Sequence, residues 1–238
     1  MYFQHSPDIW TEHPGLVAGV VFAAGVDAHA PVDSRVAGHA AVAEARLAAS
    51  AVSDLPEIQA WRRTFSRMGL KPTQYRCASE ALLRRFAKER ALPRIHPVID
   101  LCNAVSLAAA IPVGVFDAAR ISGYLEVRHA DGTEDYLTFS GEHEHPDRRE
   151  VIFADGAGRA HSRRWTNRQS GHSAVRDSTS TVLVVVEAMH DSAAVDVPEL
   201  TATIADELAG VWAVSPSTAI LSRSAPRWSY PGDYTCPA

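Results

Sequence analysis

The feature of this sequence that most limits its possible folds is the apolar run Thr-Val-Leu-Val-Val-Val at residues 181–186, which Glu187 follows directly. A continuous run rich in valine favours a strand that is buried on both faces, and therefore one at the centre of a sheet. An ionised carboxylate is costly to bury without a partner. Glu187 must therefore pair with an arginine, an amide or a ligand, or reach water at the end of the strand.

Periodic patterns predict further elements before and after this strand. Short apolar runs bounded by turn residues predict strands over residues 16–23, 124–128, 136–139, 151–154, 161–165 and 218–221. Apolar residues at helical spacing predict helices over residues 32–52, 55–68, 79–90, 98–110 and 198–212. We therefore expect one mixed α/β domain over residues 1–222. Residues 223–238 contain three prolines without apolar periodicity, and we expect this tail to be poorly ordered.

The cysteines and the apolar runs indicate the cellular compartment of the protein. Cys77, Cys102 and Cys236 are odd in number and have neither metal-binding nor redox-motif spacing, which suits a reducing compartment. No apolar run approaches the roughly 20 residues that a membrane span needs, and the first residues lack the pattern of a signal peptide. We expect a cytoplasmic protein that does not contact a membrane.

The net charge of −5 hides two strongly basic segments. Residues 62–94 contain ten Lys or Arg against two Glu, and residues 159–176 contain five Arg and no acid. Basic surface that is concentrated in this way on an acidic protein favours contact with nucleic acid. We assign nucleic-acid binding to Arg76, Arg84, Arg85, Lys88 and Arg163. The alternative is that Arg84, Arg85 and Lys88 only form the solvated face of a helix.

Residues 163–170, Arg-Arg-Trp-Thr-Asn-Arg-Gln-Ser, combine several ligand-binding groups without a carboxylate. Arginine holds an anionic group with two parallel hydrogen bonds, an indole stacks on a ring, and side-chain amides orient a water or a carbonyl. This pattern predicts a pocket wall in which Arg164, Trp165, Arg168 and Gln169 bind substrate and Asn167 serves the chemistry. The alternative is a solvated loop with one aromatic anchor.

Other chemistries lack their signatures. The run Asp155-Gly-Ala-Gly has no following Lys-Ser or Lys-Thr, so it is not a phosphate-binding loop, and no Gly-x-Ser-x-Gly elbow occurs. His143 and His145 lie two residues apart with no third ligand at metal-site spacing, which favours a solvated loop. We expect neither a metal ion nor an organic cofactor.

Several short motifs occur in an order that resembles one family. They are the pair Asp100/Asn103, the segment Pro112/Phe116/Asp117, the strand entry Ile121/Gly123, and the strands 151–155 and 179–187, accompanied by the runs 71–79 and 163–169. Together they resemble the editing module of the β-subunit of bacterial phenylalanyl-tRNA synthetase, which its third and fourth B domains form, and freestanding proteins that consist of that module. The resemblance covers residues 60–192.

This resemblance implies layered, largely antiparallel sheets with flanking helices, and a pocket for the aminoacyl-adenosine end of a mischarged tRNA. In such a module a positioned water hydrolyses the ester. By position, Cys102 and Asn103 line the amino-acid pocket, Gly114 lies at its rim, and Glu187 contacts a polar group of the substrate. Asn103, Glu187 and Asn167 are accordingly our catalytic candidates.

The sequence also departs from the synthetase module. Gly114 stands where the synthetase has a histidine, and residues 163–169 replace its glycine-rich loop, so we expect a different specificity. Our first hypothesis is a tRNA-binding protein that hydrolyses a mischarged aminoacyl-tRNA in trans and does not charge tRNA. The alternatives are a non-catalytic RNA-binding module of the same fold and a small-molecule binder with an arginine-lined pocket. Protein partners are left unspecified.

Overall fold

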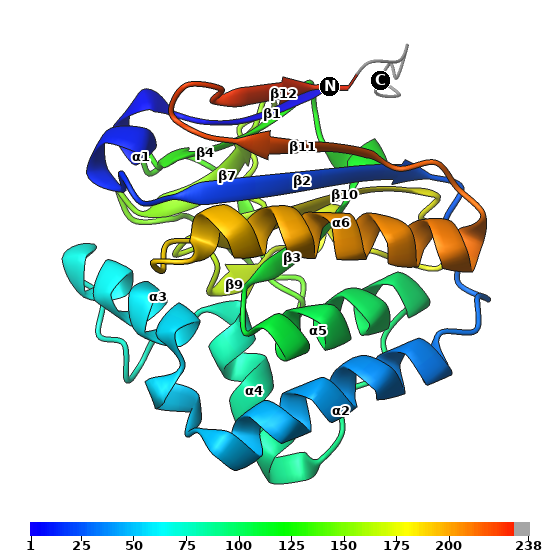
Figure 1. Ribbon diagram of the computed structural model, residues 1–238. Coiled ribbons are helices and arrows are strands. Elements are labelled where there is room, and N and C mark those ends of the chain that lie inside the picture. The colour runs from blue at the N-terminus through cyan, green and yellow to red at the C-terminus, as the bar shows by residue number, and fades with distance from the viewer. Residues whose placement is uncertain (231–238) are drawn as a thin grey trace.

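The computed structural model of the 238-residue chain describes residues 1–230, which form stacked layers of sheets and helices (Figure 1). The helices are α1 (Pro7–Glu12), α2 (Asp33–Ala49), α3 (Pro56–Arg67), α4 (Ala78–Glu89), α5 (Pro97–Ala109) and α6 (Ala193–Trp212), with 3-10 turns η1 (Val52–Asp54), η2 (Ala118–Arg120) and η3 (Gly171–Ser173). The strands are β1 (Tyr2–His5), β2 (Val17–Ala24), β3 (Val113–Asp117), β4 (Tyr124–His129), β5 (Tyr136–Leu137), β6 (His143–Glu144), β7 (Val151–Asp155), β8 (Ser162–Arg163), β9 (Arg168–Gln169), β10 (Thr181–Ala188), β11 (Ser217–Leu221) and β12 (Arg227–Ser229).

The predicted central strand is confirmed. β10 lies between β2 and β3 in an antiparallel sheet of order β11-β2-β10-β3, and all of its residues are buried. A second sheet has the order β12-β1-β4-β7, in which only the β1–β4 pair is parallel. Two short ribbons, β5–β6 and β8–β9, complete the strands. The mixed α/β class with largely antiparallel sheets and flanking helices is confirmed.

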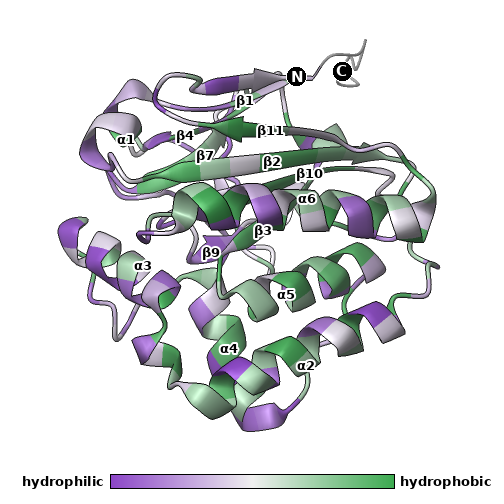
Figure 2. Ribbon diagram, viewed as in Figure 1, coloured by the Kyte–Doolittle hydropathy of each residue, from purple (hydrophilic) through white to green (hydrophobic). Residues whose placement is uncertain are grey.

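Alternate residues of β10 belong to two different hydrophobic cores. Leu183 and Val185 pack into the core between the two sheets, which also takes in the inner faces of α3 and α4. Val182, Val184 and Val186 point the other way, into the core that α5 and α6 close. Figure 2 shows this apolar centre in green, with hydrophilic residues on the outer helices. By the same alternation, Glu187 falls on the side between the sheets.

Three elements near the pocket described below were absent from the sequence-based prediction. They are β1, α1 and β3. The last helix also starts earlier than predicted, because α6 begins at Ala193 and continues through Pro198. Among the described residues, no helix is both long enough and apolar enough to cross a membrane.

The prediction of a poorly ordered tail over residues 223–238 is wrong for its first part. Residues 227–229 form β12, which pairs with β1 and places Trp228 opposite Phe3. Trp228 is buried, and the large apolar area of its indole accounts for an ordered strand in a segment without apolar periodicity. Residues 231–238 lie outside the described part of the chain.

Candidate functional site

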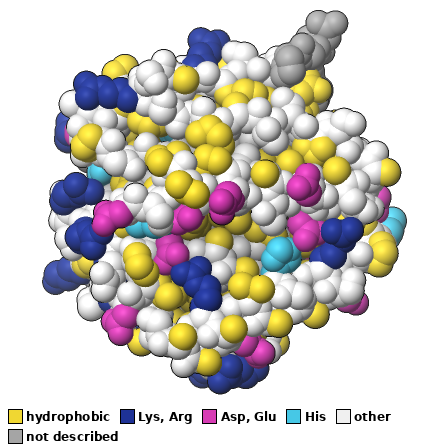
Figure 3. Space-filling model, in the orientation of Figure 1, with side chains coloured by type: hydrophobic (Ala, Val, Ile, Leu, Met, Phe, Trp, Pro, Cys, Tyr) yellow, Lys and Arg dark blue, Asp and Glu magenta, His cyan; other side chains and the backbone are white. Residues whose placement is uncertain are grey.

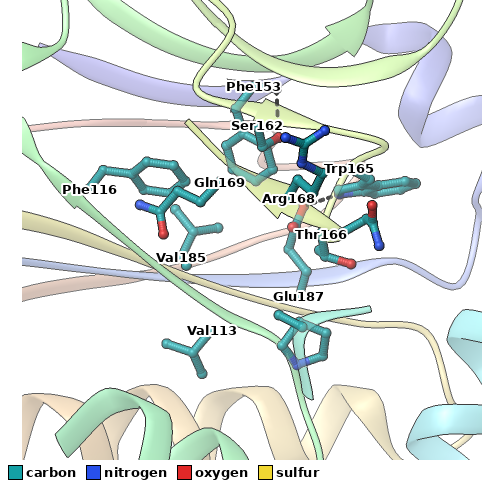
Figure 4. Close-up of a pocket in the computed structure, with 14 residues that line it drawn as sticks. Val113, Phe116, Phe153, Ser162, Trp165, Thr166, Arg168, Gln169, Val185 and Glu187 are labelled. Carbon is teal, nitrogen blue, oxygen red and sulfur yellow. Dashed lines mark hydrogen bonds between the residues drawn. The ribbon is translucent and has the colours of Figure 1, made fainter. Parts of the chain in front are cut away.

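A pocket opens between the two sheets, at the end of β10 (Figure 4). The space inside it is about 480 Å³ when its open mouth is included. The wall is mainly apolar, and the rings of Phe116 and Phe153 stack within it at 5.3 Å between centroids. The polar and charged side chains that reach it are Ser162, Thr166, Asn167, Arg168, Gln169 and Glu187.

Glu187 is buried and held by two partners at the inner wall. Its Oε1 accepts a hydrogen bond from Trp165 Nε1 at 2.9 Å and lies 2.6 Å from His5 Nε2. Of the two alternatives that the sequence left open, the structure shows the paired one, although the partners are an indole and an imidazole. Among the described residues no hydrogen-bond partner of Oε2 is found, and Glu187 lines the pocket.

His5 was missed in the sequence because it belongs to β1, a four-residue strand with no clear periodic signal. Pairing of β1 with β4 in a parallel ladder carries His5 to the space between the sheets. The ring is almost fully buried, and Trp10 packs against it at 4.9 Å between centroids. His5 therefore positions the Glu187 carboxylate from a part of the chain far away in sequence.

Trp165 owes its position to an unusual backbone. It and Arg164 have φ angles of +60° and +49°, a region that bulky non-glycine residues rarely adopt. Such a conformation costs on the order of 1–3 kcal/mol per residue and persists where surrounding contacts enforce it. Here the Trp165 amide donates to Val151 O at 2.6 Å, and Trp61 packs edge-on against the indole at 5.2 Å. The strained turn thus directs the indole N–H at Glu187.

The two predicted amides lie in the pocket wall. Gln169 Nε2 donates to Val115 O at 2.6 Å, which ties the β8–β9 ribbon to β3. Asn167 Nδ2 donates to Arg76 O at 2.8 Å, which ties the same ribbon to the segment before α4. Both side chains are held in place rather than free in solvent.

Only one of the predicted substrate-binding arginines reaches the pocket. Arg168 lies at the exposed mouth, with its guanidinium carbon 5.4 Å from the Tyr136 ring centroid and Nη1 3.6 Å from Glu144. Arg164 stacks instead on Tyr75 at 4.6 Å and does not line the pocket. Its left-handed backbone turns the side chain outward, so the prediction for Arg164 needs correction.

Arg163 is not an exposed nucleic-acid contact, as the sequence suggested, but a buried ion pair. Its guanidinium donates to both carboxylate oxygens of Glu150, at 2.9 and 2.8 Å, and to Glu144 at 2.8 Å. The hydrogen bonds to Glu150 raise the pKa of Arg163 above its already high ordinary value. Burial alone would raise the pKa of Glu150, but Arg163 outweighs it and the pKa is lowered.

Cys102 and Asn103 do not line the pocket, which corrects the prediction for both. They lie on α5, on the helix side of the central sheet, whereas the pocket is on the opposite side. Cys102 is buried in the core of that side, and desolvation raises the pKa of its thiol to about 12. A helical pattern fixes which residues share a face but not which side of a sheet the helix covers.

Gly114, which the sequence assigned to the pocket rim, lies in the pocket wall opposite Val185 in the β3–β10 ladder. A Cβ at this position would come within 3.0 Å of the Phe116 ring. A side chain here would press on this ring, so the glycine leaves room in the wall of the pocket.

The basic residues before and along α4 surround one buried carboxylate. Glu80 is 0% exposed, and three arginines approach it, namely Arg62, Arg76 and Arg84. One negative charge cannot neutralise three positive ones, so the outer face stays positive. Arg85 and Lys88 are exposed on the same helix, with Arg85 paired to Glu89 at 2.8 Å. The nucleic-acid role of this face stays a prediction.

His13 packs behind Trp165, edge-on, with 4.8 Å between ring centroids. Burial, helped by the nearby charge of Arg67, lowers the pKa of His13 from 6.5 to about 4. His13 is 3% exposed, and its lowered pKa keeps the imidazole uncharged at neutral pH.

We expect His13 to make the protein acid-sensitive. The unfolded chain binds a proton at His13 near pH 6.5 and the folded chain only near pH 4, so the stabilising contribution is complete above 6.5 and is lost as the pH falls towards 4. The loss should be about 2–3 kcal/mol. Urea unfolding across this range should show a shallower pH dependence in His13→Gln than in the wild type. His29→Gln, at an exposed site, should follow the wild type. Equal slopes in His13→Gln and wild type would refute this assignment.

Comparison with known proteins places the chain in a family. A family model of the B3/4 domain matches residues 60–197, more than half of the chain. Among solved structures, an N-terminal fragment of the phenylalanyl-tRNA synthetase β-subunit from Pyrococcus horikoshii aligns with 90% of this chain and 49% of that chain, at 11% identity and a TM-score of 0.44. This chain thus spans about half the length of that fragment. No curated protein matches in sequence. The family match confirms the predicted resemblance: the chain belongs to the B3/4 domain family, which is found in the phenylalanyl-tRNA synthetase β-subunit.

Proposed function

We propose that the chain binds the aminoacylated 3′ end of a tRNA and hydrolyses the ester of a mischarged amino acid in trans. The observation that carries this proposal is the Glu187 carboxylate, fixed by Trp165 and His5 at the inner wall of a largely apolar pocket. An aminoacyl ester presents an ammonium group and a side chain next to its carbonyl. A carboxylate with one free oxygen suits the ammonium group or a side-chain hydroxyl, and the apolar wall suits the side chain.

The polar groups at the other side of the pocket suit the reacting ester. Asn167 and Gln169 are anchored through their amide nitrogens and orient the attacking water or the ester carbonyl. Water adds to the carbonyl carbon, the bond from that carbon to the ribose oxygen breaks, and the ribose hydroxyl leaves with a proton. Arg168 at the mouth interacts with the phosphate or the terminal base.

Family membership and surface charge support the choice of tRNA. The family occurs in a tRNA synthetase subunit, and the positive face around Glu80 lies on the segment that precedes and includes α4. Ala78, at the start of α4, also lines the pocket, so the basic face and the pocket are continuous. An RNA strand lying on this face would reach the pocket with its end.

A non-catalytic RNA-binding module is the second candidate, and one observation favours it. The Ser162 hydroxyl in the pocket accepts a hydrogen bond from the Phe153 amide, and no histidine lines the described pocket to activate it. Hydrolysis must therefore depend on a positioned water. The third alternative, an arginine-lined acid pocket, loses support because Arg168 is the single arginine among the described lining residues.

Deacylation assays on a panel of mischarged tRNAs test the proposal. We expect Glu187→Gln to lower kcat/KM about a hundredfold, the usual scale for one oriented polar group, and to leave the affinity for uncharged tRNA unchanged. The matched control is Glu199→Gln, an exposed position on α6, which should behave as wild type.

The outcomes separate the two candidates. If the wild type cleaves no aminoacyl ester but binds tRNA, the non-catalytic module is correct. If Glu187→Gln cleaves as fast as the wild type, Glu187 has no part in the reaction.

A further inference from the structure

A second and larger cleft lies next to the pocket, on the far side of His13 from Trp165. Its volume is about 1310 Å³ including its open mouth. Residues 13–15 after α1, the outer face of α3 and the segment before α4 form its walls. We call this space the His13 cleft. Figure 3 shows several basic side chains along the left edge of the molecule, at the level of α3 in Figure 1.

The His13 cleft carries positive charge that the surrounding protein does not neutralise. Arg62, Arg63 and Arg67 line it. Within residues 1–230, neither Arg63 nor Arg67 forms an ion pair, and Arg67 donates only to the Thr64 hydroxyl, at 3.1 Å. Arg62 shares Glu80 with two other arginines. An anion in the cleft would therefore meet two unpaired guanidinium groups on one face of α3.

His13 provides a second, independent sign of a ligand. His13 is 3% exposed and lines the cleft, and neither of its ring nitrogens has a hydrogen-bond partner among the described residues. A buried polar group without a partner costs about 1–3 kcal/mol and needs an explanation. Glu12, whose negative charge acts on His13, is engaged by His129 at 3.0 Å and Arg149 at 3.3 Å. An uncharged imidazole retains an N–H that donates to a ligand oxygen.

A chain of side-chain contacts links the His13 cleft to the pocket. His13 packs on the Trp165 indole, and the same indole donates to Glu187. Met189, two residues after Glu187, lines the cleft as well. A ligand that spans both spaces would place one group against the arginines and another beside the carboxylate.

We propose that the His13 cleft binds phosphate, and that its source is the phosphodiester backbone of the RNA strand whose 3′ end enters the pocket. This inference rests on the proposed function and extends it, because it states that the RNA runs through the His13 cleft before its 3′ end enters the pocket. Guanidinium groups bind phosphate through paired hydrogen bonds, and a buried neutral imidazole adds a directional donor. The same chemistry would accept a free polyphosphate, and the experiment separates the two sources.

The test uses an uncharged RNA minihelix with a single-stranded 3′ CCA end, and fluorescence anisotropy at several salt concentrations. Arg63→Ala/Arg67→Ala should weaken binding about tenfold near 0.1 M salt and reduce the slope of log K against log salt by about 1.4, for two single-strand phosphates. His13→Phe retains a ring against Trp165 and should weaken binding with the slope unchanged, since an uncharged donor is lost. The control is Arg148→Ala/Arg223→Ala, two exposed arginines that line neither space.

Each outcome decides a separate point. If the wild type binds the minihelix and the Arg63/Arg67 variant binds with equal affinity and slope, the phosphate site is refuted while the proposed function stands. If the wild type does not bind RNA, the proposed function fails, and titration with tripolyphosphate decides the cleft. If tripolyphosphate shifts the NMR signals of the His13 ring in the wild type but not in Arg63→Ala/Arg67→Ala, the cleft binds free polyphosphate. If it shifts them in neither protein, the phosphate site is refuted.

Discussion

Replacing Arg163 with methionine is expected to lower the free energy of unfolding by about 3–5 kcal/mol, the usual cost of leaving one partner of a buried ion pair alone. The side chain of Glu150 is 5% exposed, and Arg163 supplies its two side-chain hydrogen bonds. The Arg164 amide, at 2.8 Å, is a much weaker substitute. Chemical denaturation measures the change.

Two further variants make this result specific. Arg164→Met removes the adjacent guanidinium, which is half-buried and stacked on Tyr75, and should cost only about 0.5–1 kcal/mol. Arg163→Met/Glu150→Met removes both charges and should recover much of the loss, since an apolar pair is tolerated where a single buried charge is not. If Arg163→Met changes the free energy of unfolding by less than about 1 kcal/mol, Glu150 must become solvated or take up a proton when its partner is lost.

Replacing Gly19 with alanine should destabilise the fold by about 3 kcal/mol, at the upper end for overpacking by one methyl group. Gly19 lies in β2, where α6 crosses the sheet. A Cβ there would come within 1.9 Å of Thr201 Oγ1 and 3.3 Å of Val197 Cγ1. Thr201 is held by its hydrogen bond to Val197 O at 2.7 Å, so it cannot turn away without losing that bond.

Thermal and urea unfolding of three variants test the Gly19 contact. Gly38→Ala adds the same methyl group on α2, where nothing lies within 4 Å, and should stabilise the protein by about 0.5–1 kcal/mol because alanine favours a helix. Gly19→Ala/Thr201→Ala should regain part of the loss, since the nearest atom is removed. Unchanged stability of Gly19→Ala would mean that α6 shifts freely on the sheet.

The sequence predicts what depends on local pattern and misses what depends on distant pairing. The valine run before Glu187 was sufficient to predict a central strand, because apolar periodicity is a property of neighbouring residues. The partner His5 was not predictable, because β1 reaches it through a parallel ladder with β4, more than a hundred residues away. A strand of four residues is too short to show a clear alternation of apolar and polar residues in the sequence.

Two failures concern the direction in which a side chain points. The charge of Arg163 suggested solvent, but its acidic partners Glu144 and Glu150 lie 19 and 13 residues earlier, and only the fold brings them together. Cys102 follows the motif pattern of the family, yet α5 turns it to the other side of the sheet. Residue type and spacing show which side chains share one face of a helix or strand. Which neighbour that face packs against depends on how whole elements pack together.

The alternation along β10 has a consequence for how this fold diversifies. Leu183, Val185 and Glu187 face the space between the sheets, whereas Val182, Val184 and Val186 support the helical layer. Substitutions at Val185 and Glu187 therefore alter the wall of the pocket, whereas those at the even positions act on the packing of the helical layer. Because the two sets of side chains lie on opposite faces of one strand, the wall of the pocket can change in shape and charge while the packing of the helices on the sheet stays the same.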